Sequence, residues 1–181
     1  RGKNPFISIN CGELAENLLL DSLFGHVKGA FTEAKADRKG AFMEANGGTL
    51  FLDEIQTASP TVQQALLRAV AMRKVKPLGT DKEYDADVRL ICATNIDLRL
   101  LIDNQQFRSD LYFRLKVITI YTPALRDHKE NIPVLINHYL SKLQNSTQRE
   151  DLGVSKGALE KMKQYPWPGN VRELMNCITR A

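Results

Sequence analysis

Two adjacent carboxylates, Asp53 and Glu54, close a short apolar segment, and this pairing suits metal-assisted chemistry. Carboxylate oxygens are hard ligands of the kind that hold Mg²⁺, and a carboxylate beside a bound metal can help to activate water. The segment that carries them, residues 47–55, begins with a glycine pair and continues through an apolar run, which favours a buried strand over a buried helix segment. A strand that ends in an ordinary acidic turn fits the same nine residues equally well.

Polar side chains also follow two other apolar segments. Asn10 ends residues 5–10, and Asn95 follows residues 88–93. The carboxyl ends of parallel strands share one edge of a sheet, where open α/β sheets bind their ligands. We therefore expect Asn10, Glu54 and Asn95 to converge on one ligand. Asparagine is also a common turn former, so each asparagine taken singly favours a structural role.

Strands alternate with helices in the part of the chain that must position these residues. Strands are expected at residues 5–10, 50–52, 88–93 and 117–121. Helices are expected at residues 13–24, stopped by Gly25, and after Ser59, which is a good N-cap with Pro60 in the first turn. This alternation predicts an α/β fold with a mostly parallel sheet and helices on its faces.

The pattern changes at residue 123, after which helices are expected. They begin at Ile132, after a capping Ser155, and at Asn170 with Glu173 as its capping-box partner, and a polar loop is expected at residues 144–151. The expected organisation is an α/β portion at residues 1–122 and a small α-helical portion at residues 123–181.

Composition excludes several classes of protein. The chain has 181 residues, 43% of them hydrophobic, and a formal net charge of +4, which alone does not argue for binding nucleic acid. Cys11, Cys92 and Cys177 are far apart and form no Cys-x-x-Cys pair, so a cytoplasmic, reduced setting is expected. No apolar run of about 18 residues predicts a membrane span.

A family resemblance rests on five segments that occur in a consistent order. Residues 47–55 resemble a Walker B segment, and the other four are Gly29-Ala30-Phe31-Thr32-Glu33-Ala34, Ala93-Thr94-Asn95, residues 107–115 and residues 167–174. Together they resemble the AAA+ central domain of bacterial sigma-54-dependent transcriptional activators, the enhancer-binding proteins. The resemblance covers nearly the whole chain.

This resemblance implies an ATPase that remodels sigma-54 RNA polymerase so that promoter DNA opens. It implies a sheet of the AAA+ P-loop type followed by a helical lid, with ATP and Mg²⁺ as cofactors. It also implies a homo-oligomeric ring, usually a hexamer, and contact with DNA through a domain that is not in this chain. No membrane partner is implied.

The resemblance assigns roles to five residues around the nucleotide. Asp53 would hold Mg²⁺ through water, and Glu54 would orient or deprotonate the attacking water. Asn10 would restrain Glu54 until the target is engaged. Asn95 would act as sensor I, and Arg172 as sensor II. For Arg172 a solvated helix position is the alternative.

Arg108 and Arg114 match the arginine fingers of the family. Such an arginine acts in trans, across a subunit boundary, by stabilising charge in the transition state. The alternative is that both arginines pair with Asp110 or Asp103 on the surface.

Gly29, Phe31 and Thr32 match the loop by which the family grips sigma-54, with Glu33 at a position where glycine is usual. Glu33 favours an ordinary backbone conformation and adds a negative charge. An ordinary surface turn whose Phe31 packs back into the core is the alternative. Glu33 also leaves open a regulator that keeps the fold for oligomerisation and ligand sensing without activating sigma-54.

The phosphate-binding motif G-x-x-x-x-G-K-[ST] does not occur among these residues. In the family it precedes the strand that corresponds to residues 5–10. The expectation is a fragment that lacks the first strand and the Walker A segment and is inactive alone, and a catalytically dead fragment is a further alternative.

Overall fold

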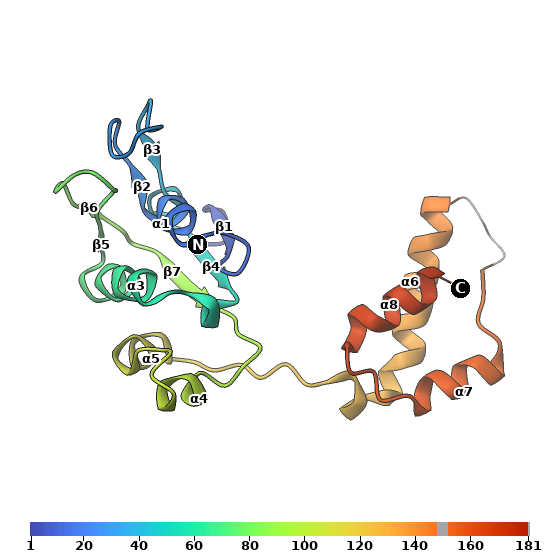
Figure 1. Ribbon diagram of the computed structural model, residues 1–181. Helices are drawn as coiled ribbons and strands as arrows, with labels where there is room; N and C mark the ends of the chain where they lie inside the picture. Colours follow the sequence, from blue (N-terminus) through green and yellow to red (C-terminus); the bar gives the residue numbers. More distant parts are fainter. Residues whose placement is uncertain (148–151, 181) are drawn as a thin grey trace. The chain divides into compact units, whose positions relative to one another are not determined.

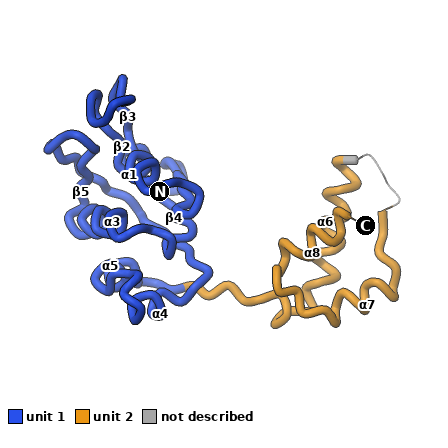
Figure 2. Tube along the Cα trace, in the orientation of Figure 1, with its two compact units in different colours: residues 1–119 blue, residues 120–181 orange. Residues whose placement is uncertain are grey.

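The computed structural model describes residues 1–147 and 152–180, and the chain forms two compact units, residues 1–119 and residues 120–181 (Figure 2). The first unit contains, in chain order, β1 (Phe6–Asn10), α1 (Glu16–Phe24), β2 (Gly25–His26), β3 (Arg38–Lys39), α2 (Ala41–Glu44), β4 (Thr49–Asp53), a 3₁₀ turn (Ile55–Thr57), α3 (Pro60–Met72), β5 (Lys74–Val75), β6 (Tyr84–Asp85), β7 (Arg89–Cys92), α4 (Leu98–Asp103) and α5 (Ser109–Leu115) (Figure 1).

Three parallel strands form the main sheet, in the order β1-β4-β7. Asn10 pairs with Asp53 across the first ladder, and Leu52 pairs with Cys92 across the second. The three strands therefore end at a common edge, with β4 in the centre. The predicted α/β fold with a parallel sheet is confirmed.

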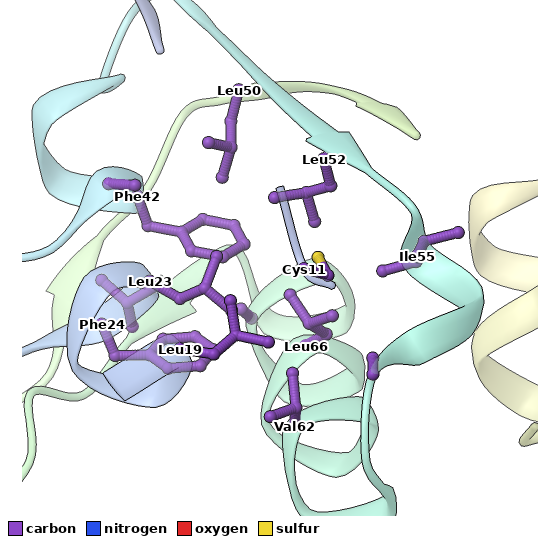
Figure 3. Close-up of a cluster of buried hydrophobic side chains, with 14 of the residues drawn as sticks. Cys11, Leu19, Leu23, Phe24, Phe42, Leu50, Leu52, Ile55, Val62 and Leu66 are labelled. Carbon is purple, nitrogen blue, oxygen red and sulfur yellow. The ribbon is translucent and has the colours of Figure 1, made fainter. Parts of the chain in front are cut away.

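One face of this sheet packs on helices α1 and α3 (Figure 3). Leu50 and Leu52 alternate with partly exposed residues along β4, so both point to the same side. The cluster they join also contains Leu19, Leu23 and Phe24 from α1, Phe42 from α2, Val62 and Leu66 from α3, and Ile55, Phe107 and Leu111. Burying each of these leucines fully stabilises the folded state by about 1.5–3 kcal/mol relative to leaving the side chain exposed.

Both predicted helix signals of this unit are confirmed in outline. Ser59 Oγ accepts a hydrogen bond from Val62 N at 3.3 Å at the start of α3, and Gly25, at φ 76°, ends α1. Helix α1 starts at Glu16 rather than at residue 13. The reason is local: Gly12 N donates to Asn10 Oδ1 at 2.8 Å, and this turn delays the helix.

Four two-residue strands were not predicted, because they are too short to show periodicity. Strand β2 pairs with β3, and β5 pairs with β6, both antiparallel. The segment after β5 lies beside β2: Leu78 N donates to Gly25 O at 2.8 Å, and Val27 N donates to Leu78 O at 3.1 Å.

The prediction of a strand at residues 117–121 is wrong, because the structure has no strand there. Val117, Ile118, Ile120 and Tyr121 are each more than four-fifths exposed, and no described strand pairs with them. A strand needs alternating apolar residues and also a neighbouring strand whose backbone pairs with its own N–H and C=O groups. None of the described strands provides such a partner for this segment.

The second unit is helical, as predicted. It contains two 3₁₀ turns (Leu125–Asp127 and Lys129–Asn131), α6 (Ile132–Thr147), α7 (Lys156–Gln164) and α8 (Asn170–Arg180). Its core consists of Leu125, Ile132, Ile136, Trp167, Leu174 and Ile178. Among the described helices of both units, none is long and apolar enough to cross a membrane.

The predicted helix ends of this unit are only partly confirmed. Ser155 caps α7, accepting from Ala158 N at 3.2 Å. Residues 144–147 of the predicted polar loop belong to α6, and residues 148–151 lie outside the described residues. Glu173 accepts from Gly169 N at 2.8 Å, but Asn170 Oδ1 accepts from Leu125 N at 2.9 Å, so Asn170 ties α8 to the first 3₁₀ turn.

Candidate active site

The carboxylate pair lies where the central strand ends. Asp53 is the last residue of β4, and Glu54 follows in the left-handed region, at φ 52° and ψ 43°. Side-chain sterics disfavour this conformation for any residue but glycine, and such strain of about 1–3 kcal/mol concentrates at functional sites. Buried Ile55 explains it, because the chain must turn sharply after β4 to bring this side chain into the core. Sequence reasoning missed this feature.

The loop after β1 approaches the Glu54 side chain closely. A Cβ placed on Gly12 would lie 2.3 Å from Glu54 Oε2 and 3.4 Å from Asn10 Oδ1. Any side chain at Gly12 would therefore displace the Glu54 carboxylate. The structure thus brings Asn10, Gly12 and Glu54 together at the edge predicted for the site.

Asn10 does not hold Glu54 in this structure. Its Nδ2 donates to Glu13 Oε1 at 3.2 Å, and its Oδ1 accepts from Gly12 N. Glu13 therefore takes the amide donor that the family resemblance assigns to Glu54. Glu54 N donates to Asp53 Oδ1 at 2.9 Å, and Thr57 Oγ1 donates to the Glu54 carbonyl at 2.7 Å.

Asn95 reaches the site through a neighbour. Its Oδ1 accepts from Gln56 Nε2 at 3.0 Å, and Gln56 lies in the 3₁₀ turn that follows Glu54. The Gln56 Oε1 atom is buried without a hydrogen-bond partner among residues 1–147 and 152–180. Asn95 and Glu54 are thus linked through one turn rather than by direct contact, and Gln56 is a site residue that sequence reasoning missed.

Two buried or half-buried thiols, Cys11 and Cys92, also lie near this edge. Burial, and then the charges of Asp53 and Glu54, raise the pKa of Cys11 to about 11. Burial, and then Cys11, raise the pKa of Cys92 to about 12. Both thiols are therefore protonated at neutral pH, and a protonated thiol is a weak nucleophile. The chemically competent groups at this edge are the two carboxylates.

The donor set fits a magnesium–nucleotide complex better than an all-protein metal site. No group of three or more acidic, histidine or cysteine side chains able to hold a metal is found in the described part of the chain. Mg²⁺ is usually held by one or two carboxylates together with phosphate oxygens and water. Asp53 and Glu54 supply the carboxylates for that arrangement.

Arg108 and Arg114 lie at opposite ends of α5 and differ in their partners. Arg108 donates from Nε and Nη2 to the two Asp110 oxygens, at 3.0 and 2.7 Å, and these hydrogen bonds hold the pKa of Asp110 below its usual value. Arg114 is exposed and forms no ion pair with any described residue. The surface pairing weighed for both arginines is therefore realised for Arg108 only.

Gln63 positions the start of α5, and sequence reasoning missed it. Its side chain is buried, Nε2 donates to Ala58 O and Gln106 O at 2.8 and 3.0 Å, and Oε1 accepts from Arg108 N at 2.8 Å. The available signal was a polar residue within the apolar stripe of α3, beside Val62.

Arg172 belongs to the second unit and is exposed on α8. It lines a shallow groove of about 720 Å³ along this helix, together with Gly169, Glu173, Asn176, Cys177 and Arg180. It forms no ion pair with any residue that the structure describes. This leaves the Arg172 guanidinium available to a ligand.

The loop that contains residues 29–34 is a compact turn above β2 and β3. Gly29 N donates to Ala34 O at 2.9 Å, and Gly29 uses the left-handed conformation that glycine permits, at φ 84°. Phe31 is 46% exposed, with its ring edge-on to His26 at 4.8 Å between centroids. Glu33 is exposed and has no positive φ, as expected for a residue other than glycine. Phe31 therefore presents an apolar surface while resting on the base of the loop.

Comparisons with known proteins agree with this arrangement. Residues 1–121 match the model of the sigma-54 interaction domain, and residues 126–181 match the AAA+ ATPase lid domain. The Nif-specific regulatory protein of Herbaspirillum seropedicae is 47% identical over the whole chain, which covers 33% of that protein. The transcriptional regulatory protein ZraR of Escherichia coli (strain K12) is 45% identical over the whole chain, which covers 41% of that protein. The chain thus spans less than half the length of these relatives.

Solved structures give the same result. NtrX from Brucella abortus in complex with ADP superposes with a TM-score of 0.89 at 28% identity, over 99% of this chain and 39% of that one. Hsp104 bound to casein, at 19% identity and a TM-score of 0.66, shares the fold. Family model, relatives and structures coincide: the chain belongs to the sigma-54 interaction domain family of transcriptional activators, with an AAA+ ATPase lid domain as its second part.

Proposed function

We propose that this chain hydrolyses ATP within a bacterial transcriptional activator and uses the energy to remodel sigma-54 RNA polymerase for open-complex formation. The observation that carries the proposal is the Asp53–Glu54 pair at the end of the central strand, with Gly12 leaving room for the Glu54 carboxylate. Membership of an AAA+ family and the nucleotide-bound NtrX structures support it. We place this activity in the cytoplasm.

Asp53 and Glu54 divide the chemistry in this proposal. When bound, Mg²⁺ and ATP supply the transferable phosphoryl group and neutralise its charge. Asp53 would hold the metal through water. Glu54 orients the attacking water and accepts its proton. The left-handed backbone of Glu54 and the hydrogen bond from its amide N to Asp53 Oδ1 fix the direction in which its side chain leaves the backbone.

Asn10, Asn95 and Arg172 regulate this centre. Asn10 restrains Glu54 when its amide leaves Glu13, so the Asn10–Glu13 contact represents the released state of the switch. Asn95 acts as sensor I and passes its state to the turn after Glu54 through Gln56. Arg172 acts as sensor II and couples the nucleotide to the lid helix α8.

A homo-oligomeric ring, most simply a hexamer, completes the site. Arg114 is the first candidate for an arginine finger supplied to a neighbouring subunit, because it has no partner within the described chain. Arg108 would have to leave Asp110 to act in the same way. Gly29, Phe31, Thr32 and Glu33 form the loop that contacts sigma-54. DNA is bound through a domain outside these residues.

The test uses the natural protein that contains this chain, assayed for ATP hydrolysis. Glu54→Gln should lower kcat by at least about 100-fold while nucleotide still binds, because the amide cannot accept the proton of water. Unchanged hydrolysis in Glu54→Gln would contradict the enzymatic proposal.

A second arm measures capture of sigma-54 in the presence of ADP and aluminium fluoride. The unmodified protein should be trapped, and Phe31→Ala should lose trapping while it keeps hydrolysis, because the exposed ring is the contact. One observation favours a regulator that does not activate sigma-54: the exposed negative charge of Glu33 at the tip of the loop. If only Glu33→Gly is trapped and the natural sequence is not, this second function is the correct one.

A further inference from the structure

Asp21 is a buried carboxylate that the proposed chemistry does not use. It lies on α1, its side chain is only 8% exposed, and each oxygen has its own partner. Asp21 Oδ1 contacts His26 Nδ1 at 2.5 Å, and Asp21 Oδ2 accepts from Arg38 Nη1 at 2.6 Å. A carboxylate is costly to bury unless its oxygens are bonded, so this pair of contacts constrains all three side chains.

The two partners come from the two strands at the base of residues 27–37, the loop that carries Phe31. His26 belongs to β2 and Arg38 to β3, and they face each other in the ladder. This ladder is only two residues long, and an isolated hairpin of that length is marginal. Asp21 therefore connects each of the two strands to α1. These connections add to the few hydrogen bonds of the short ladder itself.

Backbone packing brings α1 and both strands close enough for this bridge. A Cβ on Gly25 would lie 2.2 Å from Arg38 O, and a Cβ on Gly40 would lie 2.3 Å from the carbonyl carbon of Phe24. The backbone of β2 therefore lies directly against β3, and the residue that follows β3 lies directly against the last residue of α1. The glycines make the approach possible, and the Asp21 carboxylate fixes its geometry.

The bridge also reaches the tip of the loop. The His26 ring that contacts Asp21 supports the Phe31 ring on another side. Val27, the residue that follows His26, donates its backbone N–H to Leu78 O. The orientation of Phe31 is thus set by a ring whose own position Asp21 determines.

We propose that Asp21 is a positioning residue for the partner loop. Its carboxylate ties both strands at the base of residues 27–37 to α1, and this tie holds Phe31 and Thr32 in the orientation that sigma-54 meets. The identity of the partner rests on the proposed function, whereas the tie itself is independent of it.

Hydrogen exchange of the full-length protein tests the tie. In Asp21→Asn the side chain keeps its shape but loses the charge that holds two donors, so the protected amides of Val27, Lys28 and Gly29 should exchange about tenfold faster. Amides of β4 should be unchanged. Glu160→Gln, which removes a carboxylate from the exposed pair with Lys163, is the control and should alter neither region. Unchanged loop exchange in Asp21→Asn overturns the proposal.

Arg38→Gln protects the test against a variant that fails to fold. The Arg38 side chain is 55% exposed, so its replacement removes one arm of the tie without burying a new charge. It should speed loop exchange as Asp21→Asn does. Adding Arg38→Gln to Asp21→Asn should change loop exchange little, because Asp21→Asn already weakens the contact that Arg38 makes. Independent, additive effects would contradict the tie.

Trapping of sigma-54 with ADP and aluminium fluoride tests the role in positioning. Asp21→Asn and Arg38→Gln should lower the trapped fraction about tenfold while ATP hydrolysis in the absence of partner stays within about twofold, a split that general destabilisation does not give. Faster loop exchange with undiminished trapping overturns the positioning role. Absence of trapping by the unmodified protein refutes the proposed function and the partner role together, and the exchange measurement still decides whether the tie exists.

Discussion

At the scale of single residues, the contact between Gly12 and Glu54 decides where the candidate base can lie. Glu54 is held by a left-handed backbone and by its bond to Asp53, so its carboxylate has a defined starting position. Gly12 is the residue that leaves this position open, because a Cβ there would be 2.3 Å from Glu54 Oε2. Asn10 stands beside both, with its amide on Glu13.

Gly12→Ala should therefore impair catalysis more than folding. The added methyl group forces the flexible end of Glu54 aside, and a displacement of about 1 Å in a catalytic group costs up to about 100-fold in rate. The measurement is kcat for ATP hydrolysis together with the thermal midpoint of unfolding. Gly157→Ala is the matched control, because nothing lies within 4 Å of the new methyl group and the position is inside helix α7. Equal kcat values for the two variants would show that Glu54 does not need this space.

At the scale of elements, helix α3 does more than cover the sheet. Val62 and Leu66 fill the core, while Gln63 on the same helix reaches the segment before α5. The position of Arg108 at the start of α5 therefore depends on a buried amide in another helix. The Gln63 side chain thus couples the packing of α3 to the position of Arg108, one of the two candidate arginine fingers.

Gln63→Leu should destabilise the first unit although the volume is nearly conserved. The change leaves Arg108 N without its acceptor and two carbonyl groups without their donor, and buried polar groups left unpaired cost about 1–3 kcal/mol each. A lower urea midpoint of unfolding is the expected result. Gln64→Leu, at the exposed neighbouring position, should leave the midpoint almost unchanged. If both variants unfold at the same urea concentration, the amide network carries no stability.

At the scale of the whole molecule, the proposed function requires more than one copy of the chain. The first unit presents the carboxylates at one strand edge, while Arg114 on α5 is exposed without a partner in the described chain. Arg172 lies on α8 in the second unit, which has its own core. In the proposed function, neighbouring subunits complete this site.

Mixing two inactive variants tests this assembly. Arg114→Ala alone should lower kcat by about 10³, and Glu54→Gln should also be inactive. Mixed rings should regain part of the activity, because some interfaces then combine an intact Glu54 with an intact Arg114 from the neighbour. Arg108→Ala, whose guanidinium already pairs with Asp110, should have a smaller effect. No recovery at any mixing ratio would place Arg114 in its own subunit's site or outside catalysis.

Most elements with a strong local signal could be predicted from the sequence. The apolar segments that became β1, β4 and β7, the Ser59 and Ser155 caps and the Gly25 stop all depend on residues within one or two turns. The two-residue strands gave no periodic signal. The segment at residues 117–121 gave a false one, because a strand also needs a partner that its own residues do not specify.

The sequence by itself determined the family, the parallel α/β architecture, the helical second part and the candidate site residues, because residue types and their order along the chain carry this information. Only the tertiary structure decided which of these residues touch. It placed the Asn10 amide on Glu13, left Arg114 without an ion-pair partner in the described chain, and buried Asp21 between two strands. The Asp21–Arg38 bond joins residues 17 positions apart and the Asn10–Glu13 bond joins residues three positions apart, but both depend on side-chain orientations that packing of the whole unit sets and no local pattern specifies.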